Sequence, residues 1–208
     1  MTPVGTRDGD TVERMARVPY AKGIAKRGEI LDVAFDLFSR QGYDRTSVRE
    51  IARAVGLSQA GLIHHFSSKE ELFVEVLRRR SEENIRDFAV SDPVDTLVAI
   101  QRHNRDVPGL VRLYATLSAE STDTSHPAHD FFGERYAKIR AELAEGVRAA
   151  QDAGEIDAEL DPEAIARILL AAADGLQVQW LHDPTTDMAE EIRLLWRVIR
   201  RSGPQPAQ

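Results

Sequence analysis

The stretch Thr46-Ser-Val-Arg-Glu-Ile-Ala-Arg-Ala-Val-Gly-Leu-Ser-Gln-Ala-Gly-Leu-Ile-His-His-Phe66 decides the fold of this chain. It contains two short segments with helical periodicity, about 47–55 and 59–65, which are separated by Gly56 and Ser58. Helices this short are not stable alone, so each must pack on a neighbour. Two braced short helices joined by a tight turn predict a helix-turn-helix, whose second helix lies in the major groove of DNA.

The outward positions of the second short helix carry small or hydrogen-bonding side chains, namely Gln59, Ala60, Gly61 and His64. Small side chains let a helix lie deep against base edges, and glutamine can pair with adenine through two hydrogen bonds. The same pattern also fits an ordinary pair of packed helices, with Gly56 as a generic helix stop. The pattern alone leaves both interpretations open.

Capping and helix-breaking residues divide the rest of the chain into further helices, and no segment shows the alternation of a strand. The expected helices are 23–40, 47–55, 59–65, a long one opened by Ser68 and Glu71, one from Pro93, 109–120, one after the loop 121–127 to Ala153, 162–182 and 187–201. We therefore predict an all-α fold of about nine helices. The expected parts are a flexible tail 1–21, a three-helix domain 22–80, a larger helical body 81–202 and a tail 203–208.

The charge is distributed unevenly along the chain. Residues 14–80 carry thirteen lysines and arginines against eight acidic residues, a net charge of +5, although the 208-residue chain carries −7. Attraction to phosphate is a local field effect, so a basic N-terminal third on an acidic body is compatible with DNA binding. The acidic body weakly favours neutral or cationic small molecules over anions.

Composition excludes several classes of protein. Hydrophobic residues make up 42% and charged residues 29%, which is typical of a globular domain. There is no cysteine, so no disulfide or thiolate metal site can form. Neither a membrane span nor a signal peptide is evident. We expect a cytoplasmic protein without cofactor, metal or membrane partner.

Residues on both sides of the motif complete a longer pattern. It consists of Leu37-Phe38, Gly42-Tyr43, Thr46-Ser47, Ile51-Ala52, Gly56-Leu57-Ser58, His65-Phe66 and Ser68-Lys69-Glu70. Over about residues 24–78 the chain resembles the TetR family of bacterial transcriptional regulators. The resemblance implies a helix-turn-helix DNA-binding domain on a ligand-binding and dimerisation body. It also implies a homodimeric repressor that an unknown small-molecule effector releases from its operator.

The resemblance assigns roles to individual residues of the motif. Arg49 and Gln59 match positions that read bases, and the planar fork of an arginine suits guanine. Thr46, Ser47 and Lys69 match positions that hold phosphate. His64 and His65 are further candidate contacts, the latter equally interpretable as a buried structural residue. The chain departs from the family at Ile63, where a tyrosine usually packs against the DNA backbone.

The body carries the expected dimer interface and effector pocket. Two wide apolar stripes on the last two helices predict an interface built from Leu169, Leu176, Trp180, Met188, Ile192, Leu195, Trp196 and Ile199, with plain intramolecular core as the alternative. Candidate pocket residues are Tyr114, Phe131, Phe132, Tyr136 and Gln177.

Other functions remain open at this point. His126 and His129 form a histidine cluster outside the motif, but they lack the spacing of a metalloprotease helix, and no nucleophile elbow or phosphate loop is present. We therefore expect no catalysis. A DNA-binding architectural protein of the same fold without an inducer is the main alternative. An orphan ligand-binding module without DNA affinity, suggested by Ile63, is another.

Overall fold

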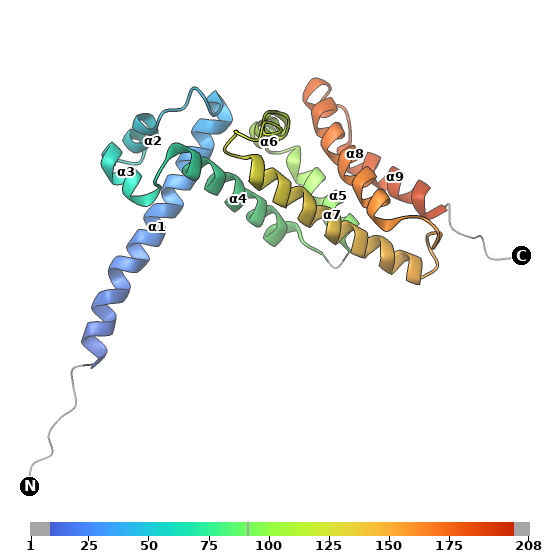
Figure 1. Cartoon of the computed structure of the whole chain (residues 1–208), viewed down its shortest axis with the longest axis horizontal. Helices are drawn as coiled ribbons and strands as arrows, with labels where there is room; N and C mark the ends of the chain where they lie inside the picture. The colour runs from blue at the N-terminus through green and yellow to red at the C-terminus, as the bar shows by residue number, and fades with distance from the viewer. Residues whose placement is uncertain (1–8, 91, 202–208) are drawn as a thin grey trace, which may run out of the picture. The chain divides into compact units, whose positions relative to one another are not determined.

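The computed structural model describes the backbone of residues 9–90 and 92–201, with side chains from residue 23 onward. Within these ranges the regular secondary structure is all helical, with nine helices and no strand (Figure 1). The helices are α1 (Gly9–Gln41), α2 (Val48–Ala54), α3 (Gln59–His65), α4 (Lys69–Phe88), α5 (Pro93–Asn104), α6 (Pro108–Glu120), α7 (His129–Asp152), α8 (Pro162–His182) and α9 (Met188–Arg201). The predicted all-α fold is confirmed.

The chain divides into two compact units, residues 1–76 and 77–208, and the boundary between them falls inside α4. The first unit holds α1, α2, α3 and the first turns of α4. The second holds the rest of α4 and the five helices that follow. The tail expected at 203–208 lies outside the described residues.

The first helix is longer than the sequence predicted. It begins at Gly9, whereas the sequence predicted a start near residue 23. The stretch before residue 22 mixes Gly, Pro, Thr and charged residues without apolar periodicity, but it also contains good helix formers such as Glu13 and Met15. Residues 1–8 lie outside the described part.

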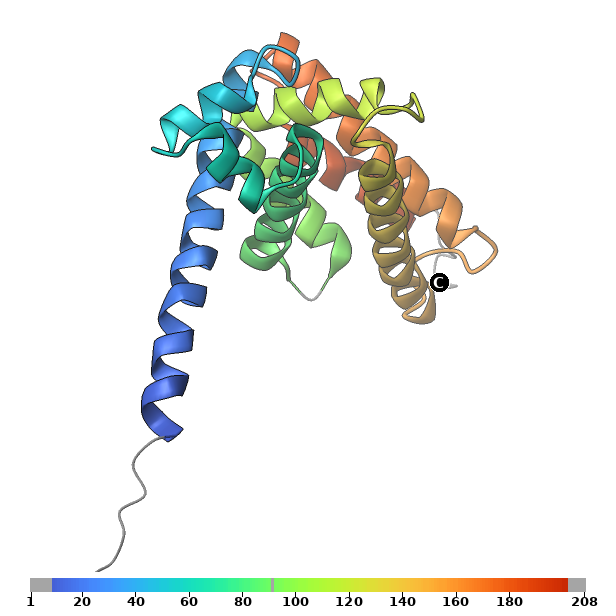
Figure 2. The ribbon, with the colours of Figure 1, turned by 60° about the vertical axis from the view of Figure 1, so that its left-hand side comes forward.

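The core of the first unit joins α1, α2, α3 and the start of α4. Ile51, Leu62 and Phe66 are fully buried, and the Phe38 and Phe73 rings meet edge to face with centroids 5.0 Å apart. Figure 2 shows α2 and α3 against the C-terminal half of α1. The two short helices thus obtain from their neighbours the burial that stabilises them.

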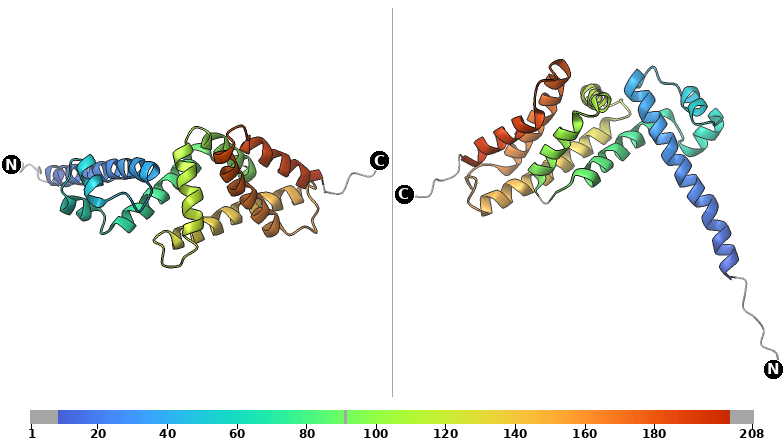
Figure 3. Two further views of the ribbon diagram at one scale, coloured as in Figure 1. Left: turned by 90° about the horizontal axis from the view of Figure 1, so that it is seen from above. Right: turned by 180° about the vertical axis from the view of Figure 1, so that it is seen from behind.

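The core of the second unit is formed mainly by α5, α7, α8 and α9. In Figure 3, α8 and α9 lie side by side, and α7 packs along α8. The Asp-Pro pairs that predicted helix starts are confirmed as caps. Asp92 accepts from the Val94 amide at 2.7 Å, and Asp161 accepts from the Glu163 amide at 3.0 Å.

The apolar stripes of α8 and α9 lie mostly in the core of the single chain, the alternative that the sequence left open, so the buried members of the predicted dimer interface are core residues. Five of its members are buried within the single chain (Leu169, Trp180, Met188, Ile192, Trp196), and Leu176, Leu195 and Ile199 are partly buried against the same core. Both helices pack on other helices of their own unit, so the widest stripe faces inward. In the described part of the chain no helix combines the length and apolarity needed to cross a lipid bilayer.

Candidate functional site

The turn between α2 and α3 has the geometry predicted for a helix-turn-helix. Gly56 adopts a φ of +69°, a left-handed conformation that glycine tolerates and that turns the chain sharply between the helices. Ser47 caps α2 by accepting from the Glu50 amide at 3.1 Å, and Ser58 caps α3 by accepting from the Gly61 amide at 3.0 Å. The capped turn positions α3 relative to α2.

Two basic side chains of α1 hold the C-terminal ends of these helices. Lys26 donates from Nζ to the Val55 carbonyl at 2.6 Å, and Arg27 donates from Nη1 to the His65 carbonyl at 2.5 Å. The Arg27 guanidinium also lies 3.9 Å from the centre of the Phe66 ring. Cationic side chains at helix C-termini donate hydrogen bonds to the unpaired carbonyls and interact favourably with the negative end of the helix dipole. Sequence reasoning missed both residues, because the contacts span 29 and 38 residues along the chain.

The exposed surface of the motif carries most of the predicted DNA contacts. Arg49, Gln59, Ala60 and His64 are exposed, whereas Gly61 and His65 are partly buried. Ala60 and Gly61 carry no large side chain that would keep this part of α3 away from a groove.

The hydroxyl groups of two residues predicted to contact phosphate are engaged within the protein. Thr46 is buried, and its hydroxyl donates to the Gly42 carbonyl at 2.8 Å, so its predicted side-chain contact with phosphate is corrected to a structural role. Ser47 is exposed but uses its hydroxyl as the cap of α2. Ile63, 39% exposed, presents an apolar surface where the resembled family has tyrosine.

Lys69 stands at the start of α4 beside an aromatic residue. Its ammonium lies 4.1 Å from the centre of the Tyr43 ring, and the Tyr43 hydroxyl donates to Glu70 at 3.0 Å. Burial and the neighbouring Glu70 raise the pKa of Tyr43, so its hydroxyl stays protonated. Ser68 accepts from the Glu71 amide at 3.1 Å, which confirms the predicted cap. The contact with Tyr43 sets the direction of the Lys69 side chain.

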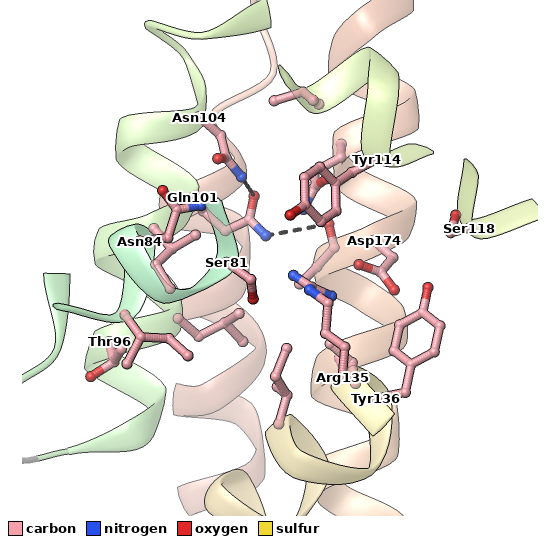
Figure 4. A pocket seen from close by; sticks show the side chains of 18 of the residues that line it. Ser81, Asn84, Thr96, Gln101, Asn104, Tyr114, Ser118, Arg135, Tyr136 and Asp174 are labelled. Carbon is pink, nitrogen blue, oxygen red and sulfur yellow. Dashed lines mark hydrogen bonds between the residues drawn. The ribbon is translucent and has the colours of Figure 1, made fainter. Parts of the chain in front are cut away.

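A cavity of about 440 Å³ lies within the second unit, among α4, α5, α6, α7 and α8. Its wall is mainly apolar, with Leu97, Ile100, Val111 and Phe132 among the lining residues. A few polar side chains converge in it (Figure 4). This size and lining are typical of sites for small organic ligands.

The polar groups of the cavity come from facing helices. Gln101 of α5 is buried and donates to the Ala173 carbonyl of α8 at 3.5 Å, and Asn104 donates to Gln101 at 3.4 Å. Asp174 of α8 lies close to Arg135 and Tyr136, both of α7 (Figure 4). Burial raises the pKa of Asp174, and the nearby Arg135 opposes that rise.

The comparisons with known proteins agree with this geometry. The model of "Bacterial regulatory proteins, tetR family" matches residues 30–76, and that of "BetI-type transcriptional repressor, C-terminal" matches residues 108–201. The HTH-type transcriptional repressor Rv1474c of Mycobacterium tuberculosis is 28% identical over 86% of this chain and 95% of its own length. The chain belongs to the TetR family. It is a DNA-binding transcriptional regulator, and the helix-turn-helix prediction is confirmed.

Further relatives of this TetR-family chain share its length and fold. The HTH-type transcriptional regulator AcrR of Shigella flexneri is 28% identical over 86% of this chain and 89% of its own length. A regulator from Saccharomonospora viridis, crystallised in complex with choline, is 26% identical and covers 86% of this chain and 98% of its own, with a TM-score of 0.66. A TetR regulator from Haloarcula marismortui, 20% identical with a TM-score of 0.73 over 87% of this chain and 99% of its own, shows the common fold.

In this TetR-family body, the cavity contains four of the five residues predicted for it. Tyr114, Phe132, Tyr136 and Gln177 line it, but Phe131 does not. Successive residues of a helix point about 100° apart. Since Phe132 faces the cavity, Phe131 turns into the core, where their rings meet edge to face at 5.2 Å.

Sequence reasoning missed the charged residues of the cavity, Arg135 and Asp174. Charged residues usually mark the solvent side of a helix, and only the tertiary fold shows that these two face inward. The histidine pair of the sequence has a local role instead. His126 accepts from the Ala128 amide at 3.2 Å, and the His129 ring contacts the Ser121 carbonyl at 2.8 Å.

Proposed function

We propose that this regulator is a homodimeric repressor that binds an operator through α3 and leaves it when a small molecule fills the cavity. The observation that carries the proposal is the exposed Gln59 and His64 surface of a capped, braced α3. That surface has hydrogen-bonding groups for base edges and, at Ala60 and Gly61, no bulk to keep the helix out of the groove.

DNA binding is tested with the regulator's own upstream sequence. We expect a gel shift with a specific duplex that survives excess unrelated DNA, and an affinity that falls steeply with salt as phosphate contacts are screened. A flat salt response would support the orphan module instead, and equal binding to every duplex would contradict sequence-specific operator recognition.

The dimer interface that we propose uses side chains left exposed on the last two helices. These are Ile168 and Val178 of α8, at 55% and 45% exposure, and Leu194 and Val198 of α9, at 48% and 57%. Exposed large apolar residues gathered on two adjacent helices are typical of a protein interface. A dimer through these helices would present two copies of α3, whose expected spacing is one DNA turn, about 34–36 Å.

A hydrogen bond gives the cavity a connection to α4. The Tyr114 hydroxyl, on the cavity wall, donates to the Leu77 carbonyl of α4 at 2.7 Å. Burial raises the pKa of Tyr114 to about 12, so the hydroxyl remains a donor at neutral pH. Because α4 continues into the DNA-binding unit, we propose that a ligand displaces α4 through this contact.

The cavity favours this proposal over an architectural role without inducer. A protein that only shapes DNA has no need of a ligand-sized, mainly apolar cavity with convergent polar groups. Adding cavity ligands from a thermal-shift screen to the gel shift discriminates between the two. Release by a ligand that also raises the melting temperature supports the repressor, whereas a complex that ignores every such ligand supports the architectural protein. Choline, bound by the Saccharomonospora relative, belongs in that screen.

A further inference from the structure

We propose that the cavity binds an amphipathic organic anion, with its acidic group on Arg135 and its apolar body against the surrounding helices. The inference deepens the proposed function, since it names the chemical class of the effector. It rests on the charge and hydrogen bonding of the cavity wall, which differ from those of the acidic body as a whole.

Arg135 is a cavity residue whose hydrogen-bonding capacity is unfilled. Its Nε is buried without a hydrogen-bond partner, and its guanidinium stands 5.2 Å from the centre of the Tyr114 ring. Figure 4 shows the side chain reaching into the cavity between Asp174 and Gln101. A guanidinium does not lose its proton at any ordinary pH, and a buried, unpaired N–H is costly. A carboxylate, which matches the guanidinium fork through two parallel hydrogen bonds, would remove that cost.

Asp174 is the acidic residue near Arg135 that would repel an anionic ligand. It lies in the same wall and interacts electrostatically with Arg135, but its carboxyl is largely buried. Burial raises its pKa and thus favours its neutral form, in which it opposes an incoming anion less. Glu142, the other acidic lining residue, is partly exposed to solvent.

The aromatic side chains argue against a cationic ligand. A quaternary ammonium ion binds over aromatic faces, and the guanidinium of Arg135 already stands near the Tyr114 ring. Tyr136 lies near Asp174 in the same wall. A cation would therefore enter next to a fixed positive charge, whereas an anion would enter next to its partner.

The rest of the wall requires an apolar body on the ligand. Aliphatic side chains of the lining come from five helices, with Ile85 of α4, Leu97 and Ile100 of α5, Val111 of α6, Ile139 and Leu143 of α7, and Leu170 of α8. Burying apolar surface against them is favourable, at roughly 25 cal/mol per Å². Medium-chain and aryl-alkyl carboxylates meet both requirements.

The inference is tested by calorimetry on the whole chain without DNA. The affinities of ligands that share one apolar tail and differ only in the polar head group are compared. The probes are decanoate, decanamide and decyltrimethylammonium below their micelle concentrations, and the matching 3-phenylpropyl series. We expect the carboxylate of at least one series to bind at least about tenfold more tightly than its amide and ammonium counterparts. Equal binding of the amide, preference for the ammonium ion or no binding by either carboxylate would overturn the proposal.

Substitutions in α7 and α8 test whether the ligand's carboxylate contacts Arg135. Arg135→Met, which keeps the volume and removes the charge, should weaken the carboxylate by about tenfold to a hundredfold, and Arg135→Lys by less. Lys138→Met removes a charge from an exposed site of the same helix and should change nothing. Asp174→Asn should preserve or strengthen carboxylate binding. A loss of carboxylate binding in this variant would contradict the assignment of the carboxylate to Arg135. Because no operator is present in the calorimetry, a negative result there does not affect the proposal of DNA binding. Likewise, a ligand that fails to release the operator in the gel shift does not affect the proposal that the cavity binds a carboxylate.

Discussion

Arg27 of α1 donates from Nη1 to the carbonyl oxygen of His65, the last residue of α3, across 2.5 Å. The same side chain pairs with Glu75 of α4 at 3.3 Å and lies over the Phe66 ring. One side chain thus links three helices of the DNA-binding unit at the C-terminal end of α3. The orientation of α3 is therefore determined by α1 as well as by the turn at Gly56.

Arg27→Gln should weaken operator binding although Arg27 is not among the predicted DNA contacts. We expect about a fivefold loss of affinity, near 1 kcal/mol, because a charge-assisted bond to a carbonyl is lost and the site is partly exposed. Titration of a labelled operator measures the effect. Arg40→Gln, which removes an exposed ion pair with Asp36 on the same helix, is the matched control. Equal affinities of the two variants would refute the positioning role.

Base and phosphate contacts should separate in a mutational series. Arg49→Ala and Gln59→Ala should each cost about 1–3 kcal/mol on the best operator and less on altered ones, which relaxes sequence choice. Lys69→Ala should weaken all duplexes alike and reduce the slope of log affinity against log salt by about one. The measurement is binding to a panel of operator variants at several salt concentrations. Three variants with the same profile would contradict the assignment.

The exposed surface of α8 and α9 should control the oligomeric state. Leu194→Glu and Val198→Glu place a charge on side chains that are 48% and 57% exposed, so we expect folded monomers by light scattering with helical circular dichroism intact. Ile192→Glu, at a fully buried position of α9, should unfold the body instead. Persistent dimers in both surface variants would place the interface elsewhere.

Asp174→Asn should stabilise the protein at neutral pH. Burial raises the folded-state pKa of Asp174 above its unfolded value near about 3.9, so the folded state binds the proton more tightly. The stability of the parent protein therefore falls as pH rises through this interval, whereas the amide has no proton to lose. Thermal unfolding from pH 4 to pH 8 should show an advantage for the variant that grows with pH. An advantage that shrinks with rising pH would mean that Arg135 outweighs burial.

The helix-turn-helix was predictable because its signals are local. Ser47 and Ser58 cap the amides three residues ahead, and Gly56 turns the chain between them. Each signal depends on residues within a few positions of one another, as do the Asp-Pro helix starts. The one large error in helix bounds, the start of α1, lies in a stretch that lacks apolar periodicity but contains good helix formers.

The sites of the body were less predictable because helical spacing does not say what a face meets. The stripe with Ile192 and Trp196 was interpreted as a dimer surface, but the chain uses it as its own core. Phe131 and Phe132 were indistinguishable until the rotation of α7 was known. Thr46 likewise matched a phosphate contact by position, and only the fold shows its hydroxyl bonded to Gly42.

The order of amino acids by itself determined the helices, the turn of the DNA-reading motif and the family, because these depend on periodicity and on contacts between near neighbours. Tertiary structure alone decided which apolar faces are core, which charged side chains enter the cavity and which residues of α1 brace α3. Those outcomes depend on contacts between residues far apart in the chain, such as Arg27 with His65 or Tyr114 with Leu77, and the spacing of residues along one helix carries no information about them.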